Sequence, residues 1–312
     1  MTIARPITQQ APDCRQLLGA SVGFAIDSTI GLYSMRSGGG ARLAIAEESL
    51  PAPEGDLLQE WPAQAGRRAI RLHAFGSGYE VHTETLGTFR VLPSEGTILV
   101  PPTDDHLRRE ATIFSTPIAL CTAAGGDIAL HAASVAFGSS AVLIVAAGGG
   151  GKSTTAAAFH KAGFRLLADD FTRCSVGKEP LAFPGPAMVR LRPEPIKRLR
   201  LPDVSPIGRQ GGKIFLGISS QRRGTGDPVP LRGILFLAVG SERPRLEQLR
   251  SAEALALLWR QSFFVPTAAD RERAFSGLAS LVAKVPAWTL RRQLRIEELR
   301  PTIELVANTF AR

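Results

Sequence analysis

The chain has 312 residues, 44% hydrophobic content and a net charge of +9, so it can bury a sizeable core as one large domain with a smaller one. Three scattered cysteines, Cys14, Cys121 and Cys174, exclude a disulfide framework and a Cys-based metal site, and we expect buried, inert thiols in a reducing compartment. No run of about 18 apolar residues occurs, and the first residues lack the order of a signal peptide, so we expect a cytoplasmic protein without a membrane span.

Residues 1–102 are predicted to form a small, antiparallel, β-rich domain. Short runs of β-branched and aromatic residues alternate with glycine turns, which is typical of hairpins. The stretch from Gly38 to Ala65 is rich in Gly, Pro and Glu and is predicted to be a loop. The predicted extended segments are Ala20–Ser34, the pair Ile70–Phe75 and Tyr79–Thr83, and the pair Gly87–Leu92 and Thr97–Val100.

Residues 103–312 are predicted to form an α/β domain. A connecting helix over Thr103–Ala123, which Pro117 would kink or interrupt, leads into it. A strand, a glycine loop, a helix and a second strand then follow one another as in a βαβ unit. The expected elements are strands at Ile128–Phe137, Ala141–Ala146, Phe164–Ala168 and Gly233–Val239, and helices at Thr154–Ala162, Ser251–Phe263, Ala268–Val285 and Ile296–Phe310.

The glycine loop has the pattern of a phosphate-binding loop. Ala146-Ala-Gly-Gly-Gly-Gly-Lys152-Ser153 matches [AG]-x-x-x-x-G-K-[ST] and lies between an apolar strand and a helix. Glycines let successive backbone N–H groups surround phosphate oxygens at a helix N-terminus, while the lysine reaches the β- and γ-phosphates and the serine hydroxyl binds Mg²⁺. We therefore predict that ATP·Mg²⁺ binds to Gly148, Gly149, Gly150, Gly151, Lys152, Ser153 and Thr154.

Two carboxylates, Asp169 and Asp170, end the next predicted strand, only 16 residues after Ser153. This short spacing leaves room for one helix and one strand, so we expect both side chains at the carboxyl edge of the sheet, beside the loop. One carboxylate would hold Mg²⁺ or its bound water, and the other would orient an acceptor hydroxyl and take its proton.

His131 lies on the strand before the loop strand. A lone histidine among apolar residues is usually a core residue with its hydrogen bonds satisfied. This position would also bring the ring beside the aspartates, where it could steer a carboxylate or sense the γ-phosphate.

Basic residues are concentrated in one region. Between Ala187 and Arg250 there are 13 Lys or Arg against 5 Asp or Glu, whereas the rest of the chain has 24 against 23. The excess is consistent with an anionic ligand or partner, or equally with a solvated surface. Arg190, Arg192 and Lys213, the last in a basic stretch predicted to be flexible, are candidates to contact γ-phosphate or an acidic acceptor. Aromatic residues, at 6%, barely interleave with the basic run, so we expect no nucleic-acid binding.

Four segments also carry a family resemblance. They are Leu130-His-Ala-Ala-Ser-Val-Ala-Phe-Gly138, Val142-Leu-Ile-Val145, Gly151-Lys-Ser153 and Gly163-Phe-Arg-Leu-Leu-Ala-Asp-Asp170. Together they resemble the C-terminal domain of HPr serine kinase/phosphorylase, and more closely the HPr-kinase-like proteins found with lasso-peptide pathways. The close match covers about residues 128–172, and a looser likeness extends to the β-rich N-terminal third and the C-terminal helices.

The resemblance implies an α/β P-loop kinase domain related to phosphoenolpyruvate carboxykinase, with a small β-rich N-terminal domain. It implies that Lys152 and Ser153 occupy the phosphate and magnesium positions. Asp169 matches the catalytic base, Asp170 its metal-side neighbour and His131 the histidine that assists them.

Two departures from the family pattern limit what it implies. The metal-binding Glu of a Glu-x-Arg-Gly-type segment has no evident match, because Phe183-Pro-Gly-Pro186 occupies that region, so the pattern leaves a second metal ligand open. The C-terminal Pro-Gly-Arg-Asn-type substrate loop is also missing, so HPr itself is not expected to be the acceptor.

Three hypotheses about function remain open. The first is an ATP-dependent kinase that phosphorylates a serine of a peptide or small protein, such as a lasso-peptide precursor. The second is a kinase of a free small molecule, such as an amino acid or a sugar alcohol. The third is an ATP-binding regulatory protein without transfer activity. The sequence also leaves open whether the chain forms a homo-oligomer.

Overall fold

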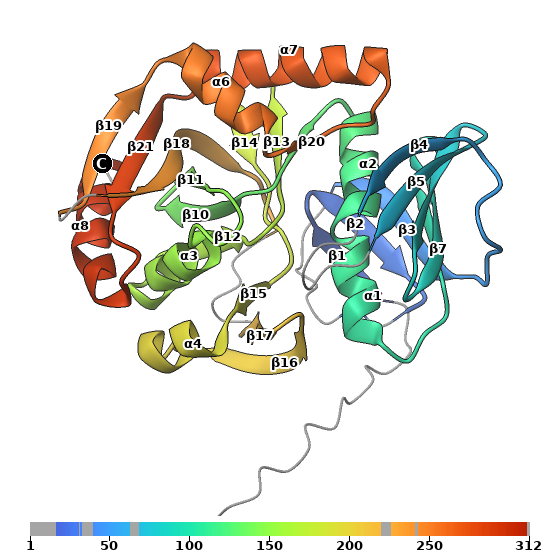
Figure 1. Ribbon diagram of the computed structural model, residues 1–312, viewed down its shortest axis with the longest axis horizontal. Coiled ribbons are helices and arrows are strands. Elements are labelled where there is room, and N and C mark those ends of the chain that lie inside the picture. Colours follow the sequence, from blue (N-terminus) through green and yellow to red (C-terminus); the bar gives the residue numbers. More distant parts are fainter. Residues whose placement is uncertain are drawn as a thin grey trace, which may run out of the picture.

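The computed structural model describes residues 17–30, 32, 40–62, 69–219, 226–240 and 243–310, and only the backbone of 17–21 and 298. The prediction for Cys14, and parts of those for Ala20–Ser34 and Gly38–Ala65, lie outside these residues. Figure 1 shows a β-rich unit at one end of the molecule and an α/β unit at the other, with a small sheet beside the latter. The predicted mixed α/β fold class is confirmed at this level, whereas the domain boundary at residue 102 stays a prediction.

Within the described residues, the N-terminal sheet has eight strands in the order β1-β2-β3-β8-β7-β6-β5-β4. Both predicted hairpins are present as the antiparallel pairs β5–β6 and β7–β8. The sheet is not wholly antiparallel as predicted, because β3 runs parallel to both β2 and β8. The elements are β1 (Leu17–Ser21), β2 (Phe24–Ser28), β3 (Ala41–Glu47), β4 (Leu57–Trp61), β5 (Ile70–Phe75), β6 (Gly78–Thr83), β7 (Gly87–Leu92), the 3-10 helix η1 (Pro93–Glu95) and β8 (Thr97–Val100).

The loop predicted over Gly38–Ala65 is wrong, because this segment contains β3 and β4. β3 lies inside the sheet and buries Leu43 and Ile45, which are both 1% exposed. The alternation of these two residues is the strand signal. Alanines between them and the Pro- and Glu-rich residues that follow obscure it in the sequence.

Two helices connect the units, α1 (His106–Ile113) and α2 (Thr116–Ala124). The predicted interruption is confirmed, since Pro117 lies in the first turn of α2, where its missing N–H is not needed by the helix. α2 is buried from Thr116 to Thr122 and packs between the N-terminal sheet and β9 of the second unit. One core therefore continues across α2 and includes Phe171 and Val265 of the second unit.

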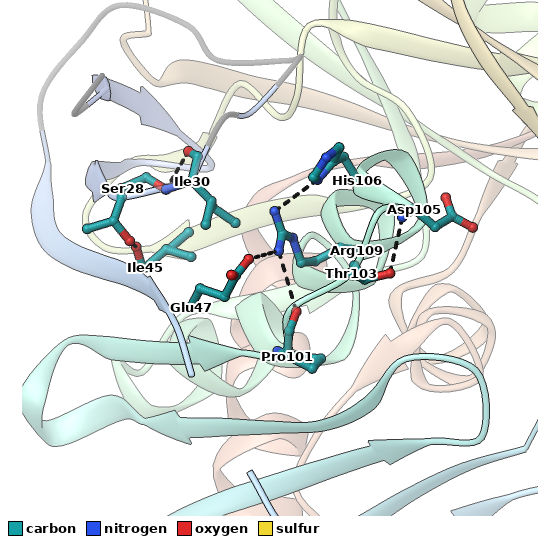
Figure 2. Close-up of polar contacts among 10 residues, drawn as sticks. Ser28, Ile30, Ile45, Glu47, Pro101, Thr103, Asp105, His106 and Arg109 are labelled. Carbon is teal, nitrogen blue, oxygen red and sulfur yellow. Dashed lines mark hydrogen bonds and ion pairs between the residues drawn. The ribbon is translucent and has the colours of Figure 1, made fainter. Parts of the chain in front are cut away.

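Arg109 of α1 ties the helix to the N-terminal sheet (Figure 2). Its buried guanidinium pairs with Glu47 at the end of β3, donates to the Pro101 carbonyl at 3.4 Å, and lies 3.1 Å from Nδ1 of His106. The charge of this buried arginine is thus matched by a carboxylate.

The second sheet has the strand order β12-β10-β11-β18-β14-β13-β9-β20 among the described residues, with β21 beside β18 and β19 beyond it. Strand β11 is parallel to β18, and β10 is antiparallel to both β11 and β12. The strands are β9 (Ile128–Leu130), β10 (Ala133–Phe137), β11 (Ser140–Val145), β12 (Arg165–Ala168), β13 (Thr172–Val176), β14 (Pro180–Ala182), β18 (Val229–Val239), β19 (Arg245–Leu249), β20 (Ser262–Phe263) and β21 (Ala287–Arg292).

The βαβ unit is present, with β10 inserted between its two parallel strands, β11 and β12. The carboxyl ends of β11 and β12 therefore lie at the same edge of the sheet, which is where the glycine loop and the aspartates are attached. The strand predicted over Ile128–Phe137 is divided, because the chain changes partners at His131 and Ala132: β9 pairs with β13, and β10 pairs with β11.

Helices cover both faces of this sheet (Figure 1). α3 (Lys152–Lys161) and α8 (Leu299–Phe310), which follows the 3-10 helix η2 (Ile296–Glu298), share one apolar core. α6 (Ser251–Trp259) and α7 (Ala268–Lys284) pack on the opposite core. The helix predicted to run to Phe263 ends at Trp259, because the residues after it form β20 against β9.

A small sheet in the order β15-β17-β16 lies beside the α/β unit, with α4 (Pro193–Leu199) following its first strand. Its strands are β15 (Met188–Leu191), β16 (Val204–Gln210) and β17 (Lys213–Ile218). The described part of the stretch predicted to be flexible is thus a hairpin with its turn at Gly211 and Gly212. Cys121 and Cys174 are buried and free as expected, and burial raises the pKa of the Cys121 thiol to about 12.

The turn between β1 and β2 joins the two units. Val22 is fully buried in a left-handed conformation (φ 56°), which is unusual for a β-branched residue. Its N–H donates to the Pro184 carbonyl at 2.7 Å, and its carbonyl accepts from Nη1 of Arg173 at 3.0 Å. The Arg173 guanidinium pairs with Asp127 and lies over the ring of Phe183. The strained turn is therefore held on both sides by the second unit.

Gly23, the next residue, provides a test of this junction. It has φ 74°, and a Cβ there would lie 2.3 Å from Cδ1 of Phe183. We expect Gly23→Ala to lower the free energy of unfolding by about 2–3 kcal/mol, from backbone strain and steric overlap. Gly76→Ala is the matched control, because Gly76 also has a positive φ (51°) but open space around its Cβ position, so a loss of about 1 kcal/mol is expected. Equal losses in denaturant unfolding would show that the junction contact is unimportant.

Candidate functional site

The glycine loop of residues 146–151 connects β11 to α3. Gly149 and Gly151 have φ values of 81° and 83°, in the left-handed region that glycine adopts most readily. A Cβ at Gly150 would lie 2.8 Å from the Cβ of Ala146, so glycine is also required there for close packing. Lys152, the lysine of the loop pattern, folds back over the loop, and its Nζ donates to the Ala146 carbonyl at 2.8 Å.

The first turn of α3 is suited to an anion. Gly151 is its N-cap and offers no side-chain cap, and no acidic residue lies in the first turn. The positive end of the helix is therefore not neutralised locally by the helix itself. Ser153 and Thr154 are half-buried there, with Gly148 and Gly149 exposed in the loop above.

Asp169 and Asp170 follow β12 at the same sheet edge, and Arg190 of β15 holds both. The Arg190 backbone N–H donates to Oδ2 of Asp169 at 2.9 Å, while its Nη2 pairs with Oδ2 of Asp170 at 2.9 Å. The other oxygen of Asp169, Oδ1, is buried and accepts no well-formed hydrogen bond among the described residues. A buried carboxylate oxygen left in this state is unusual and is typical of a functional site.

The backbone of Asp170 is also unusual, with φ 70°. Its carbonyl oxygen lies 2.9 Å from Nδ1 of His131, and its Oδ1 lies 3.4 Å from the same nitrogen. Because a carbonyl oxygen can only accept, Nδ1 carries the proton and the ring fixes this left-handed turn. His131 is therefore beside the pair, as predicted, and one of its contacts is with the backbone.

The two neighbouring carboxyls have opposite pKa shifts. Burial, and then the charge of Asp170, raise the pKa of Asp169, although Arg190 and the Ser153 hydroxyl act against this. Burial also acts to raise the pKa of Asp170, but Arg190, His131, Lys213 and Lys152 together hold it well below its usual range. Two carboxyls whose pKa values are shifted in opposite directions are suited to different chemical roles.

The structure places the predicted substrate residues in two groups. Arg190 contacts both aspartates, and Lys213, at the start of β17, is close enough to act electrostatically on Asp170. Arg192 is exposed at the N-cap of α4, and within the described residues it forms no hydrogen bond or ion pair with either aspartate. The roles of all these residues stay predictions.

Sequence reasoning missed Arg292 at the end of β21. It is 3% exposed and donates from Nη2 to Oγ1 of Thr155 at 2.8 Å and to the Gly150 carbonyl at 3.3 Å. It lies 140 residues beyond the loop and belongs to no motif, and β21 itself was not predicted. The one sequence feature that could have indicated Arg292 is that it closes a short strand containing Ala, Trp and Leu, and this indication is weak.

The site offers few of the side chains that bind metal ions. No group of three or more His, Cys, Asp or Glu side chains that could hold a metal ion occurs in the described part of the chain. Mg²⁺ in phosphate sites needs fewer protein ligands, because phosphate oxygens and water complete its octahedron. Asp170, which is held ionised, and the hydroxyl of Ser153 fit such a partial set.

The comparisons with known proteins identify no family for this chain. No family model matches the chain, and no curated protein matches it. One of the solved structures that it resembles is the HPr(Ser) kinase/phosphatase from Coxiella burnetii, with 12% identity, 58% of this chain and 95% of that chain covered, and a TM-score of 0.33. None of the helices in the described ranges is long and apolar enough to cross a membrane.

The raised pKa of Asp169 predicts a gain in stability when its charge is removed. Because the folded-state pKa lies above the unfolded value of about 4, ionised Asp169 destabilises the folded state once the pH exceeds that value. We expect Asp169→Asn to melt at a higher temperature than wild type at pH 7.5, with a difference that shrinks towards pH 4. Thermal melts between pH 4 and 8 measure this. A lower melting temperature for Asp169→Asn at neutral pH would contradict the assigned shift.

Proposed function

We propose that the chain is an ATP- and Mg²⁺-dependent phosphotransferase that phosphorylates a hydroxyl group. The observation that carries the proposal is Oδ1 of Asp169, which is buried, accepts no well-formed hydrogen bond among the described residues, and lies at the same sheet edge as Lys152 and Ser153. A loop that can hold a triphosphate and a carboxylate that can take a proton are the two parts that phosphoryl transfer needs.

Each side chain has a distinct proposed task. The loop N–H groups and Lys152 hold the β- and γ-phosphates, and Ser153 and Asp170 hold Mg²⁺, which when bound neutralises phosphate charge. Asp169 orients the acceptor hydroxyl and takes its proton, and its raised pKa makes it a stronger base than an ordinary carboxylate. The acceptor oxygen would form the new bond to the γ-phosphorus, while the bond to the β-phosphate oxygen breaks and its electron pair leaves with ADP.

Arg190 and His131 support this arrangement without taking the proton. Arg190 holds Asp170 ionised and fixes one oxygen of Asp169, so that the other oxygen stays available. His131 fixes the left-handed turn at Asp170 through its carbonyl. The family resemblance in the sequence implies the same roles for the aspartates and the histidine.

For the acceptor we propose a serine in an acidic peptide or small protein. The small sheet and α4 carry exposed cations at Arg192, Lys197, Arg200 and Arg209, and the small sheet reaches the aspartates through Arg190. The nearby Glu194 and Glu297 pair with Arg198 instead, so these acids do not neutralise the four. A basic face next to the proposed base favours an anionic acceptor.

The transfer reaction is tested by incubating the protein with ATP, Mg²⁺ and a panel of peptides and metabolites, and recording a mass gain of one phosphoryl group. We expect Lys152→Ala and Asp169→Asn each to reduce transfer by about 100-fold or more. Lys161→Ala and Asp104→Asn are matched controls at exposed positions and should retain wild-type rates.

The outcomes separate the three hypotheses. Transfer to serine peptides supports the proposal, and transfer only to free amino acids or polyols supports the small-molecule kinase. ATP binding without transfer to any acceptor supports the regulatory protein. Unchanged transfer by Asp169→Asn would remove this residue as the base.

The basic face predicts a charge preference. Serine peptides with acidic flanks should be better acceptors than the same peptides with neutral flanks, and the advantage should shrink as salt is added. Arg209→Ala should lower kcat/KM for the acidic peptide by about two- to fivefold. Arg271→Ala, at an exposed position on α7, is the control and should have no effect. An acidic peptide that reacts no faster than a neutral one at low salt would rule out this acceptor class.

A further inference from the structure

Arg292 lies beneath the glycine loop and contacts it closely. Its Nη1 donates to the Gln293 carbonyl at 2.9 Å, and its Nη2 donates to Oγ1 of Thr155 and to the Gly150 carbonyl. A Cβ at Gly151 would lie only 2.7 Å from Nη2, so the guanidinium touches the N-cap of α3. Its Nε is buried and has no hydrogen-bond partner among the described residues.

The charge of this arginine is not matched by the protein. Arg109, Arg173 and Arg190 are also largely buried, and each forms an ion pair with a carboxylate. Among the described residues, the hydrogen-bond partners of Arg292 are all neutral oxygens, and no Asp or Glu forms an ion pair with it. Burial lowers its pKa, and no carboxylate acts in the opposite direction.

A buried, unmatched charge destabilises the folded protein unless something else compensates for it. The positive end of α3 lies at the same loop and adds to the positive potential around Arg292, whereas the charge of Lys152 acts on Asp170. Arg292 and the helix end become favourable together when an anion of high charge occupies the loop. Arg292 is thus placed where it would be costly in a purely structural role.

The contact with Gly150 also has a directional effect. In a trans peptide, the C=O of one residue and the N–H of the next point in opposite directions. Arg292 donates to the Gly150 carbonyl, so the N–H of Gly151, in the same peptide, points away from Arg292. A donor fixed in this direction is what phosphate binding by a loop requires.

We propose that Arg292 is a positioning residue of the phosphate site, which orients the loop N–H groups and supplies the second positive charge that balances a bound polyphosphate. This rests on the proposed function only in that the loop binds a triphosphate. The proposal predicts that removing the charge of Arg292 leaves the thermal stability of the ligand-free protein unchanged or raises it. The same change should weaken the binding of polyphosphate.

The test uses Arg292→Met, which keeps the length and apolar stem of the side chain but removes its charge. We expect the ligand-free variant to melt at the wild-type temperature or higher, because an unmatched buried charge is gone. We expect its affinity for Mg²⁺-tripolyphosphate and for Mg²⁺-ATP to fall by at least about tenfold, equally for both ligands, because the effect is on the phosphates. Arg292→Lys should bind better than Arg292→Met, because it keeps the charge.

Arg291→Met is the matched control, since Arg291 is the preceding residue of β21 and pairs with Glu247. It should bind tripolyphosphate as wild type does. A ligand-free Arg292→Met protein that fails to fold or melts well below wild type would show a structural role and overturn the proposal. Wild-type affinity in Arg292→Met would overturn it equally.

The same titrations separate this proposal from the proposed function. If wild type binds neither Mg²⁺-ATP nor tripolyphosphate, both fail. If wild type binds both ligands, Lys152→Ala does not, and Arg292→Met binds as wild type, only the role of Arg292 fails.

Discussion

The contact of Arg190 with both aspartates is the interaction on which the candidate site depends. Through its backbone N–H it fixes one oxygen of Asp169, and through its guanidinium it pairs with Asp170. Two adjacent buried carboxylates would otherwise both resist ionisation, because each is desolvated and repels the other. The two carboxyls differ because burial raises the pKa of Asp169 against the action of Arg190, whereas Arg190, helped by other nearby cations, keeps Asp170 ionised.

The position of Arg190 depends in turn on the N-terminal unit. The strained turn at Val22 bonds to Pro184, and Gly185 donates to the Leu167 carbonyl of β12 at 2.9 Å. This segment leads directly into β15, so it fixes the position of Arg190 relative to the two aspartates. A Cβ at Gly185 would lie 2.9 Å from the Cβ of Ala168, so the segment also packs closely against the residue before Asp169. The β-rich unit is therefore part of the support of the site and not a separate attachment.

Much of the α/β framework could be predicted from the sequence, because apolar strands, a glycine loop and an alanine-rich helix each carry a local signal. The hairpin at Gly76 and the interruption at Pro117 were predictable for the same reason. The small sheet was not, because the glycines and basic residues around its β16–β17 turn favour a flexible segment, and β15 pairs with β17 across the intervening α4. β3 was missed because two residues, Leu43 and Ile45, carry its whole alternation.

The site shows the same division between local and distant signals. Lys152 and the aspartates belong to motifs with short spacing, and the structure brings them to one sheet edge. Arg292 reaches the loop from β21, and nothing in its own neighbourhood in the sequence indicates that destination. Arg192 lies two residues after Arg190 in the sequence, but it is beyond the end of β15, at the N-cap of α4, and is exposed.

The most direct measurement of the central claim is a carboxyl-carbon NMR titration that follows Asp169 and Asp170 separately. The account predicts that Asp169 takes up its proton above the ordinary value of 3.8, while Asp170 stays ionised to well below it. In Arg190→Ala, the Asp170 transition should move upwards. Two transitions that coincide near 3.8 in the wild-type protein, unchanged by Arg190→Ala, would contradict the division of roles between the two aspartates.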